Sequence, residues 1–242
     1  MKHIKKCTNT INTIMINIET DFYNANEAFE YFYKTISKHG VKFADTRALF
    51  NIGFTMHRPQ LNIIADEKRK WNLDYAKAEW EWYLSRDPHV KGLGKIYGKI
   101  PPIWERMADK EGDVNSNYGY QWQRGSVHKR VMGAEETSQL DYVINKLKKH
   151  KHTRHAAISI YDAKEHDKFD TDTPCTYAIQ FTNVENRLNM CVTMRSNDLW
   201  YGFCNDQYQF SKLQEMIAKE INIEMGTYYH FAHNFHLYNN KL

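Results

Sequence analysis

The chain has 242 residues, with 33 basic and 29 acidic side chains and a formal net charge of +4. This length is enough to bury one hydrophobic core, and no linker, repeat or low-complexity tract divides the chain, which predicts a single domain over residues 1–242. The small positive excess suits an anionic ligand such as a nucleotide and is too weak to indicate nucleic-acid binding.

The cysteines and the apolar runs indicate a soluble cytoplasmic protein. Cys7, Cys175, Cys191 and Cys204 show no C-x-x-C spacing and no paired framework, which is typical of a reducing compartment. The longest apolar runs are too short to span a bilayer, and the first residues lead into polar Thr and Asn rather than into a signal-peptide core.

Hydrophobic periodicity predicts three helices before the last third of the chain. Asn24 to Lys38 has one apolar face and stops at His39-Gly40. Thr137 to Lys149 ends in lysines, which the helix dipole favours. The helix Asp74 to Ser85 has four apolar residues spaced for burial, namely Ala76, Trp80, Tyr83 and Leu84.

A β-hairpin is predicted around a candidate nucleophile. After a strand over Ala156 to Tyr161, the β-branched and aromatic run Thr176 to Phe181 and the alternating run Leu188 to Met194 read as two strands, joined by a polar turn at Asn183 to Arg187. This hairpin places Cys175 at the start of one strand and Arg195 at the end of the other.

Cys175 is a useful nucleophile only as a thiolate. A free cysteine has a pKa of about 8.5 and needs a nearby cation or helix N-terminus to ionise at neutral pH. Arg195 can supply that charge, and its guanidinium can also bind a phosphate, with a hydroxyl added by Ser196. The structural alternative is a buried cysteine beside a surface arginine.

The C-terminal part predicts one more helix and a last strand. Asp206 followed by Gln209 fits an N-cap with a capping-box partner, and the apolar face of the helix comprises Phe210, Leu213, Met216, Ile217 and Ile221. The last strand contains His230, His233 and His236. Residues three apart in a strand face opposite sides, so no three-histidine metal site is expected.

The order of motifs resembles the thymidylate synthase family. It runs Pro174-Cys175, strand, Arg195-Ser196-x-Asp198, Gly202, Asn205-Asp206, amphipathic helix and His236-Leu237-Tyr238. Within that family the chain resembles the phage deoxycytidylate hydroxymethylases in two runs, Asn115-Ser116-Asn117-Tyr118-Gly119 and Met194-Arg195-Ser196-Asn197-Asp198. The resemblance extends from about Lys38 to Tyr238.

The resemblance implies a fold, a co-substrate and partners. The expected fold is α/β (α+β), with a large twisted mixed β-sheet flanked by helices and a homodimer formed through sheet faces. The expected ligands are a pyrimidine deoxynucleoside monophosphate and 5,10-methylenetetrahydrofolate. If the chain is phage-encoded, it works in the host bacterial cytoplasm.

Two residues are assigned to catalysis by the resemblance. Cys175 adds to C6 of the pyrimidine, which makes C5 nucleophilic. The segment Glu79 to Leu84 resembles the family's Glu-x-x-Trp-aromatic-Leu run, whose first carboxylate orders water and relays protons. Glu79 is therefore expected to be partly buried with a raised pKa, although a helical glutamate is more often solvated.

Binding of the phosphate is assigned to basic side chains and one hydroxyl. The resemblance gives this role to Lys38, Arg195 and Ser196, and to an Arg154 that crosses the dimer interface. Arg47 is a rival of Lys38, and a solvated helix C-terminus is the alternative for either. His155 stands where relatives carry a second arginine, so phosphate binding there would depend on its protonation.

The remaining ligand contacts also come from the resemblance. Asn117 and Tyr118 are placed beside the cysteine at the substrate, where a plain polar turn is the alternative. His236 and Tyr238 are assigned to the 3′-hydroxyl of deoxyribose. The folate is assigned to Trp104, Asp198 and Gly202.

Asp206 is predicted to choose the base. Relatives that act on deoxyuridylate carry Asn here, whose amide matches uracil O4 and N3–H. A carboxyl accepts from the amino group at N4 of cytosine and, when protonated, also donates to N3. Asp206 therefore predicts cytosine, whereas an alignment shifted onto Asn205 would reverse the prediction.

The leading hypothesis is a folate-dependent deoxycytidylate 5-hydroxymethylase. A deoxyuridylate hydroxymethylase and a C5-methylase of the thymidylate synthase type are the close alternatives, and a catalytically dead nucleotide- or RNA-binding relative is the alternative from another class. Relatives continue beyond the His-x-Tyr segment and close their C-terminal residues over the folate. This sequence stops at Leu242, so another segment is expected to form the lid, or the folate to be held more loosely, or the closing tail to lie outside this sequence.

Overall fold

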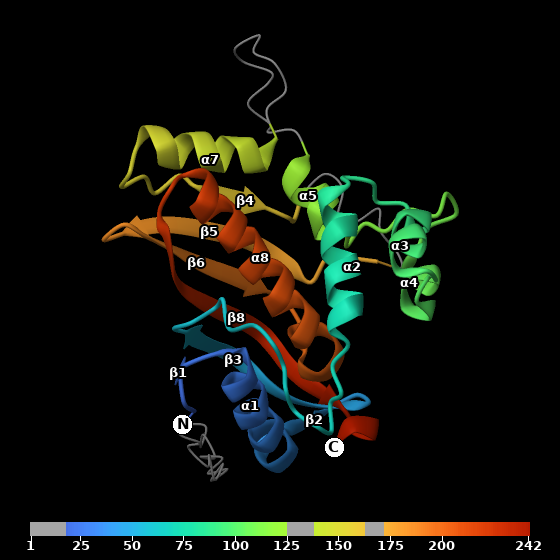
Figure 1. The fold of residues 1–242 in the computed structure, drawn as a ribbon. Coiled ribbons are helices and arrows are strands. Elements are labelled where there is room, and N and C mark those ends of the chain that lie inside the picture. Colours follow the sequence, from blue (N-terminus) through green and yellow to red (C-terminus); the bar gives the residue numbers. More distant parts are fainter. Residues whose placement is uncertain (1–17, 125–137, 163–171) are drawn as a thin grey trace, which may run out of the picture.

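The computed structural model describes residues 18–124, 138–162 and 172–242. The strands in these ranges form one mixed sheet (Figure 1). The order in the sheet is β1-β3-β8-β6-β5-β4, with β2 paired to β3 and β7 paired to β8. The strands are β1 Asp21–Phe22, β2 Val41–Phe43, β3 Thr46–Met56, β4 Ala157–Ser159, β5 Thr176–Val184, β6 Arg187–Met194, β7 Asn197–Asp198 and β8 Glu224–Tyr238.

Helices flank this sheet. In Figure 1, α8 crosses in front of β6 and β8, α1 packs on β3 and β8, and α7 packs on β4. The expected α/β class with a large mixed sheet flanked by helices is confirmed. The helical elements are α1 Ala25–His39, α2 Leu73–Leu84, α3 Val90–Tyr97, α4 Pro102–Met107, α5 Tyr118–Gln123, α7 Gln139–Lys149, η2 Leu199–Phe203, α8 Cys204–Glu220 and η3 Asn239–Lys241.

The hairpin of β5 and β6 confirms the prediction around Cys175. Its turn is shorter than expected, because Val184 already pairs with Arg187. The two turn residues, Glu185 and Asn186, have positive φ angles of 50° and 60°, as two-residue hairpin turns of type I′ require. Arg195 donates its backbone N–H to the carbonyl of Cys175 at 2.8 Å, so the ends of the two strands are tied together.

Strand β8 is central, since it pairs antiparallel with β3 and parallel with β6 and β7. Every second residue is buried from Gly226 to Ala232, and after the unburied His233 and Asn234 three consecutive residues, Phe235, His236 and Leu237, are all buried. This break in the alternation lies where Asp198 of β7 pairs with His236. The end of β8 is therefore held against the segment that follows β6.

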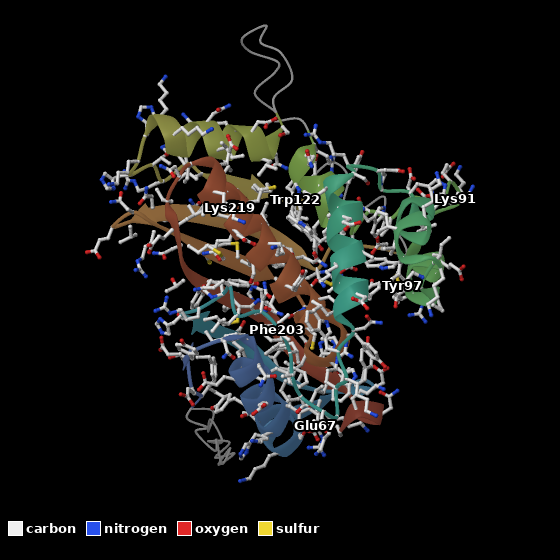
Figure 2. The ribbon with its side chains drawn as sticks, viewed as in Figure 1. Glu67, Lys91, Tyr97, Trp122, Phe203 and Lys219 are labelled. Carbon is white, nitrogen blue, oxygen red and sulfur yellow. The ribbon has the colours of Figure 1, made fainter. Side chains whose placement is uncertain are left out.

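The core between α8, α1 and the sheet is aromatic. Figure 2 shows Phe203 at one end of α8 and Lys219 at the other, and Phe203 contacts Phe54, Phe235 and the ring of His230. His230 is fully buried, and burial lowers its pKa to about 3. Its Nδ1 lies 3.0 Å from the hydroxyl of Tyr228.

Two helix predictions differ from the structure in informative ways. In α2 the buried residues are Ala76, Ala78, Glu79, Trp82 and Tyr83, whereas Leu84 is 41% exposed. The apolar spacing had favoured Trp80 and Leu84, but α2 packs against α3, α5 and α8. Contact on several sides replaces the single apolar stripe of a surface helix.

The N-cap alternative for Asp206 is wrong. Helix α8 begins at Cys204 directly after η2, and its N-cap residue is Phe203 without a side-chain bond. Asp206 therefore lies inside the first turn of α8. The two other predicted helices are present: α1 begins at Ala25 after the N-cap Asn24, and α7 begins at Gln139 after the N-cap Ser138, while Thr137 lies outside the described residues.

Neither a membrane span nor a metal cluster is found in the described ranges. No helix within residues 18–124, 138–162 and 172–242 is long and apolar enough to cross a bilayer. The same residues contain no group of three or more His, Cys, Asp or Glu side chains arranged to hold a metal ion.

Candidate active site

Cys175 is partly exposed at the start of β5, next to Arg195. The Arg195 guanidinium donates to the backbone carbonyls of Thr173 at 2.7 Å and Pro174 at 3.1 Å, which fixes it beside the thiol. Burial raises the pKa of Cys175 to about 11, and the Arg195 charge opposes that shift. The expected direction of the arginine effect is confirmed, but burial outweighs it, so the thiol is not ionised by Arg195 alone.

The turn before α5 is fastened to the segment that carries Cys175. The Asp172 carboxylate accepts from the backbone N–H of Ser116 at 2.6 Å. Asn117 is fully buried and caps α5 by accepting from the N–H of Tyr120 at 2.8 Å. Tyr118 follows, and the charges of Asp206 and Cys175 help burial to raise the pKa of its hydroxyl. Tyr118 therefore lies beside the nucleophile, as the resemblance implied.

Gly119 allows this arrangement. A Cβ atom at this position would overlap the backbone of Tyr83 in α2. Only a glycine lets α5 approach α2 so closely. The contact brings the helix that carries Tyr118 against the helix that carries Glu79.

Glu79 is 3% exposed, and each of its oxygens accepts a hydrogen bond from a neutral donor. The Tyr75 hydroxyl donates to Oε1 at 2.6 Å and the Gln209 amide to Oε2 at 2.9 Å. Burial raises the pKa of Glu79 to about 7, although both bonds oppose the shift. A carboxyl that titrates near neutral pH suits proton transfer. The prediction of a raised pKa is confirmed.

Asp206 is a second such carboxyl. Burial first and the charge of Glu79 second raise the pKa of Asp206 to about 8. Its Oδ2 accepts from the side-chain amide of Asn197 at 2.7 Å. The neighbouring Asn205 is engaged elsewhere, accepting from the indole N–H of Trp71 at 2.8 Å. The structure therefore places Asp206, rather than Asn205, next to Glu79.

The residues expected at the folate surround the same region. Trp104 is partly exposed, and its indole N–H donates to the Tyr75 hydroxyl at 2.7 Å, so Tyr75 joins it to Glu79. Asp198 accepts from the backbone N–H groups of Trp200 at 3.1 Å and Tyr201 at 2.7 Å, which starts η2. Gly202 lies against the Asn197 and Asp206 side chains.

The two residues expected at the 3′-hydroxyl lie at the end of β8. His236 is nearly buried, with its Nδ1 3.0 Å from the side-chain oxygen of Asn234. Burial lowers the pKa of His236, while the charge of Asp198 opposes that shift. Tyr238 is 37% exposed, and burial and then Asp198 raise its pKa, with a smaller contribution from Cys175. Both residues therefore lie near Asp198, and Tyr238 also lies within electrostatic reach of the nucleophile.

The residues expected to bind the phosphate do not all lie together. Ser196 is partly exposed next to Arg195, and Lys38 is exposed in the last turn of α1. Arg47 is exposed and donates to the Gly40 carbonyl at 3.5 Å. Neither Lys38 nor Arg47 is distinguished by these contacts, so both assignments stay predictions.

Arg154 and His155 are exposed in the turn before β4. Strand β4 pairs Ser159 with Ala178 and Ala157 with Gln180, so the chain before β4 runs away from Cys175. Arg154 is thus remote from the nucleophile of its own chain. Its phosphate role, if it has one, belongs to another subunit's site and stays a prediction.

Four residues of this cluster were not anticipated. The contact of Tyr75 with Glu79 could have been predicted, because Tyr75 precedes Glu79 by four residues and so lies on the same helix face. Asn197 stood inside a quoted motif but without a role. Asp172 and Gln209 had no local signal, since their partners lie far away in the sequence. These partners are Ser116 and Glu79.

A partly exposed thiol beside an arginine, with two protonatable carboxyls nearby, is an arrangement that suits covalent catalysis on a polar substrate. Residues 29–242 match the family model described as thymidylate synthase. The chain therefore belongs to the thymidylate synthase family, which uses 5,10-methylenetetrahydrofolate as the one-carbon donor to C5 of a pyrimidine nucleotide.

Individual relatives agree with this membership. The thymidylate synthase of Bacillus licheniformis is 26% identical over 196 residues, which are 81% of this chain and 67% of that protein. That of Bacillus atrophaeus is 27% identical over 179 residues, which are 74% of this chain and 75% of that protein. The solved structure of thermostable thymidylate synthase A from Bacillus subtilis covers 89% of this chain and 80% of its own, with a TM-score of 0.74 and 22% identity. This last likeness shows the fold.

Proposed function

We propose that the protein transfers a one-carbon unit from 5,10-methylenetetrahydrofolate to C5 of deoxycytidylate, and that water completes the reaction to give 5-hydroxymethyldeoxycytidylate. The observation that carries the proposal is the state of Asp206. Its pKa of about 8 leaves the carboxyl largely protonated at neutral pH. A neutral carboxyl offers one acceptor and one donor, which match the N4 amino group and the bare N3 of cytosine.

In the proposed reaction, Cys175 Sγ adds to C6 of the pyrimidine, and the electron pair released at C5 attacks the one-carbon unit supplied by the folate. C5 then loses its proton, and tetrahydrofolate leaves. Water adds to the exocyclic methylene, and the sulfur departs from C6. Glu79, with a pKa of about 7, can order that water and move protons at neutral pH.

The folate assignment rests on Trp104 and Asp198. Trp104 is partly exposed, and its N–H is already bonded to Tyr75. The indole therefore offers a flat aromatic face rather than a donor. Asp198 accepts from the backbone N–H groups of Trp200, Tyr201 and Gly202, and its two oxygens together still keep a lone pair for a ligand N–H. These residues fit a flat heterocycle with polar edges.

A homodimer is part of the proposal. One side of β5, β6 and β8 is buried under helices, whereas the alternate residues on the other side are partly exposed, including Tyr229 at 39%. An exposed sheet face with aromatic residues suits a second copy of the chain. Such a dimer would give Arg154 a phosphate in the partner's site, which its own site does not offer. Sedimentation equilibrium would test the dimer, and a monomer at assay concentration would contradict it.

The test is product identity. The wild type is incubated with methylenetetrahydrofolate and either deoxycytidylate or deoxyuridylate. The products are separated, and their molecular masses are measured by mass spectrometry. The expected product is the hydroxymethyl derivative of deoxycytidylate. Asp206→Asn is expected to transfer the preference to deoxyuridylate, while Asn205→Asp, which keeps an acceptor for Trp71, leaves the preference unchanged. A wild type that prefers deoxyuridylate contradicts the base assignment.

A methylase is the second candidate, because the relatives reported above are named thymidylate synthases. A methyl product from either nucleotide supports it and rules out the hydroxymethylase. A hydroxymethyl product from deoxyuridylate alone supports the deoxyuridylate hydroxymethylase. Absence of any product, with nucleotide binding retained in both wild type and Cys175→Ala, supports a binding protein without catalysis.

A further inference from the structure

The neutral Asp206 carboxyl matches cytosine only when its proton lies on one particular oxygen. A neutral carboxyl with its proton on one oxygen presents an acceptor and a donor in one order, and with the proton on the other oxygen it presents the reverse order. Cytosine requires an acceptor for its N4 amino group and a donor for N3. Uracil requires a donor for O4 and an acceptor for N3–H. Something must therefore hold the proton on one oxygen.

Asn197 makes the two oxygens of Asp206 different. Its side-chain amide donates to Oδ2 at 2.7 Å. An oxygen that already accepts from an N–H group is the carbonyl oxygen of a neutral acid, since a proton placed there would compete with the donor. The proton of Asp206 is thereby directed to Oδ1. Oδ2 keeps a second lone pair to accept from a ligand.

The amide is held in this position by its surroundings. Asn197 is 2% exposed in β7 and pairs with Phe235 of β8. Its Oδ1 is buried without a hydrogen-bond partner in the described part of the chain, so the bond to Asp206 is the polar contact that orients the side chain there. A Cβ atom at Gly202 would lie 2.9 Å from the Asn197 amide nitrogen and 3.3 Å from Asp206 Oδ2. Gly202 therefore leaves the room that this hydrogen bond needs.

We propose that Asn197 sets the base selectivity of the site, because its amide N–H fixes which oxygen of Asp206 carries the proton. Asn197 is a positioning residue that acts through Asp206 and does not touch the nucleotide. The inference rests on the proposed function in one respect: Asp206 must face the pyrimidine. It does not depend on which pyrimidine the wild type prefers.

The test compares binding of deoxycytidylate and deoxyuridylate by isothermal titration calorimetry without folate. In Asn197→Leu, which keeps the side-chain size and removes the donor, the ratio of the two dissociation constants is expected to move toward one by roughly tenfold or more, the effect of one mismatched buried hydrogen bond. Gly202→Ala keeps Asn197 but displaces its amide, and it is expected to change the ratio in the same direction.

Gln207→Met is the matched control. Gln207 is also a fully buried amide of this region, but it donates to the carbonyls of Asn62 at 2.8 Å and Cys204 at 3.1 Å. Its removal is expected to lower stability and to leave the ratio unchanged. An unchanged ratio in folded Asn197→Leu, or in Gly202→Ala if that variant alone folds, overturns the inference. A wild type that favours deoxyuridylate, together with a collapsed ratio in Asn197→Leu, overturns the proposed function and supports the inference.

Discussion

Burial raises the pKa of the thiol and of both carboxyls at this site, but the consequence for their chemistry is opposite. Burial raises the pKa of Cys175 to about 11, and it raises those of Glu79 and Asp206 to about 7 and 8. The shift removes charge from the sulfur, which must be anionic to attack. The same shift brings the carboxyls into the range where they exchange protons at neutral pH.

The thiol and the two carboxyls also differ in the groups that surround them. Cys175 lies beside the cation Arg195, which opposes the effect of burial. Within the described part of the chain, Glu79 accepts hydrogen bonds from the neutral side chains of Tyr75 and Gln209, and Asp206 accepts one from the neutral amide of Asn197. Neutral donors orient a carboxyl without forcing it to ionise. The comparison teaches that the thiol needs a neighbouring positive charge to favour its reactive form, whereas burial with neutral donors is enough to bring the carboxyls near neutral pKa values.

Removal of the sulfur is expected to have the largest effect. Cys175→Ala should lower kcat by on the order of 10⁴-fold or more, as loss of a covalent nucleophile does in other enzymes. The Kd for the nucleotide should change little, because Arg195 remains. Steady-state kinetics and calorimetry measure the two quantities. Cys191→Ala removes another partly exposed thiol, and a comparable loss of kcat in that control would contradict the assignment.

Removal of the first carboxyl is expected to have the next largest effect. Glu79→Gln should lower kcat by about 10²- to 10⁴-fold, since the amide cannot exchange a proton. The change of kcat near pH 7 that Glu79 produces in the wild type should also disappear. A kcat profile from acid to alkaline pH measures both effects. Glu81→Gln lies on the exposed side of the same helix, and an equal loss there would exclude a specific role for Glu79.

Asp206→Asn is expected to stabilise the fold at alkaline pH. The pKa of Asp206 is about 8 in the folded protein and 3.8 as its reference value. Between these values the folded state binds more protons, so the wild type loses stability as pH rises, by up to about 1.4 kcal/mol per pH unit. The variant lacks this loss. Urea unfolding measures the free energy of unfolding at pH 5 and at pH 8. The value for the variant minus that for the wild type should be larger at pH 8 by roughly a few kcal/mol.

The exposed Asp74→Asn serves as the control for this measurement. Its stability relative to the wild type should be nearly the same at both pH values. A difference between Asp206→Asn and wild type that does not grow with pH would mean that Asp206 is ionised in the folded protein at neutral pH. The contrast between thiol and carboxyls would then fail.

The close contact between α5 and α2 at Gly119 gives the smallest expected effect. Gly119→Ala places a Cβ atom against the backbone of Tyr83, so α5 must move away from α2 at a cost of about 1–3 kcal/mol. Thermal unfolding measures that cost. Gly98→Asn is the control, because nothing lies within 4 Å of a Cβ there and asparagine tolerates its positive φ. Equal losses in both variants would show that α5 and α2 are not closely packed.

The parts of the protein that depend on neighbours in sequence were predictable. Strand alternation and a polar turn located the β5–β6 hairpin, and with it the adjacency of Cys175 and Arg195. One-sided apolar spacing located α1 and α7, because the period of a helix is decided by residues three and four apart. The order of motifs along the chain pointed to the family before any packing was known.

Contacts between distant segments decided the rest. The buried side of α2 could not be read from its apolar spacing, because three different helices cover it. The hydrogen-bond partners of the two buried carboxyls come from elsewhere in the chain: Gln209 reaches Glu79 from α8, and Asn197 reaches Asp206 from β7. Whether a carboxyl is charged depends on how much water the fold removes from around it. That quantity exists only once α2, α8 and β7 have packed together.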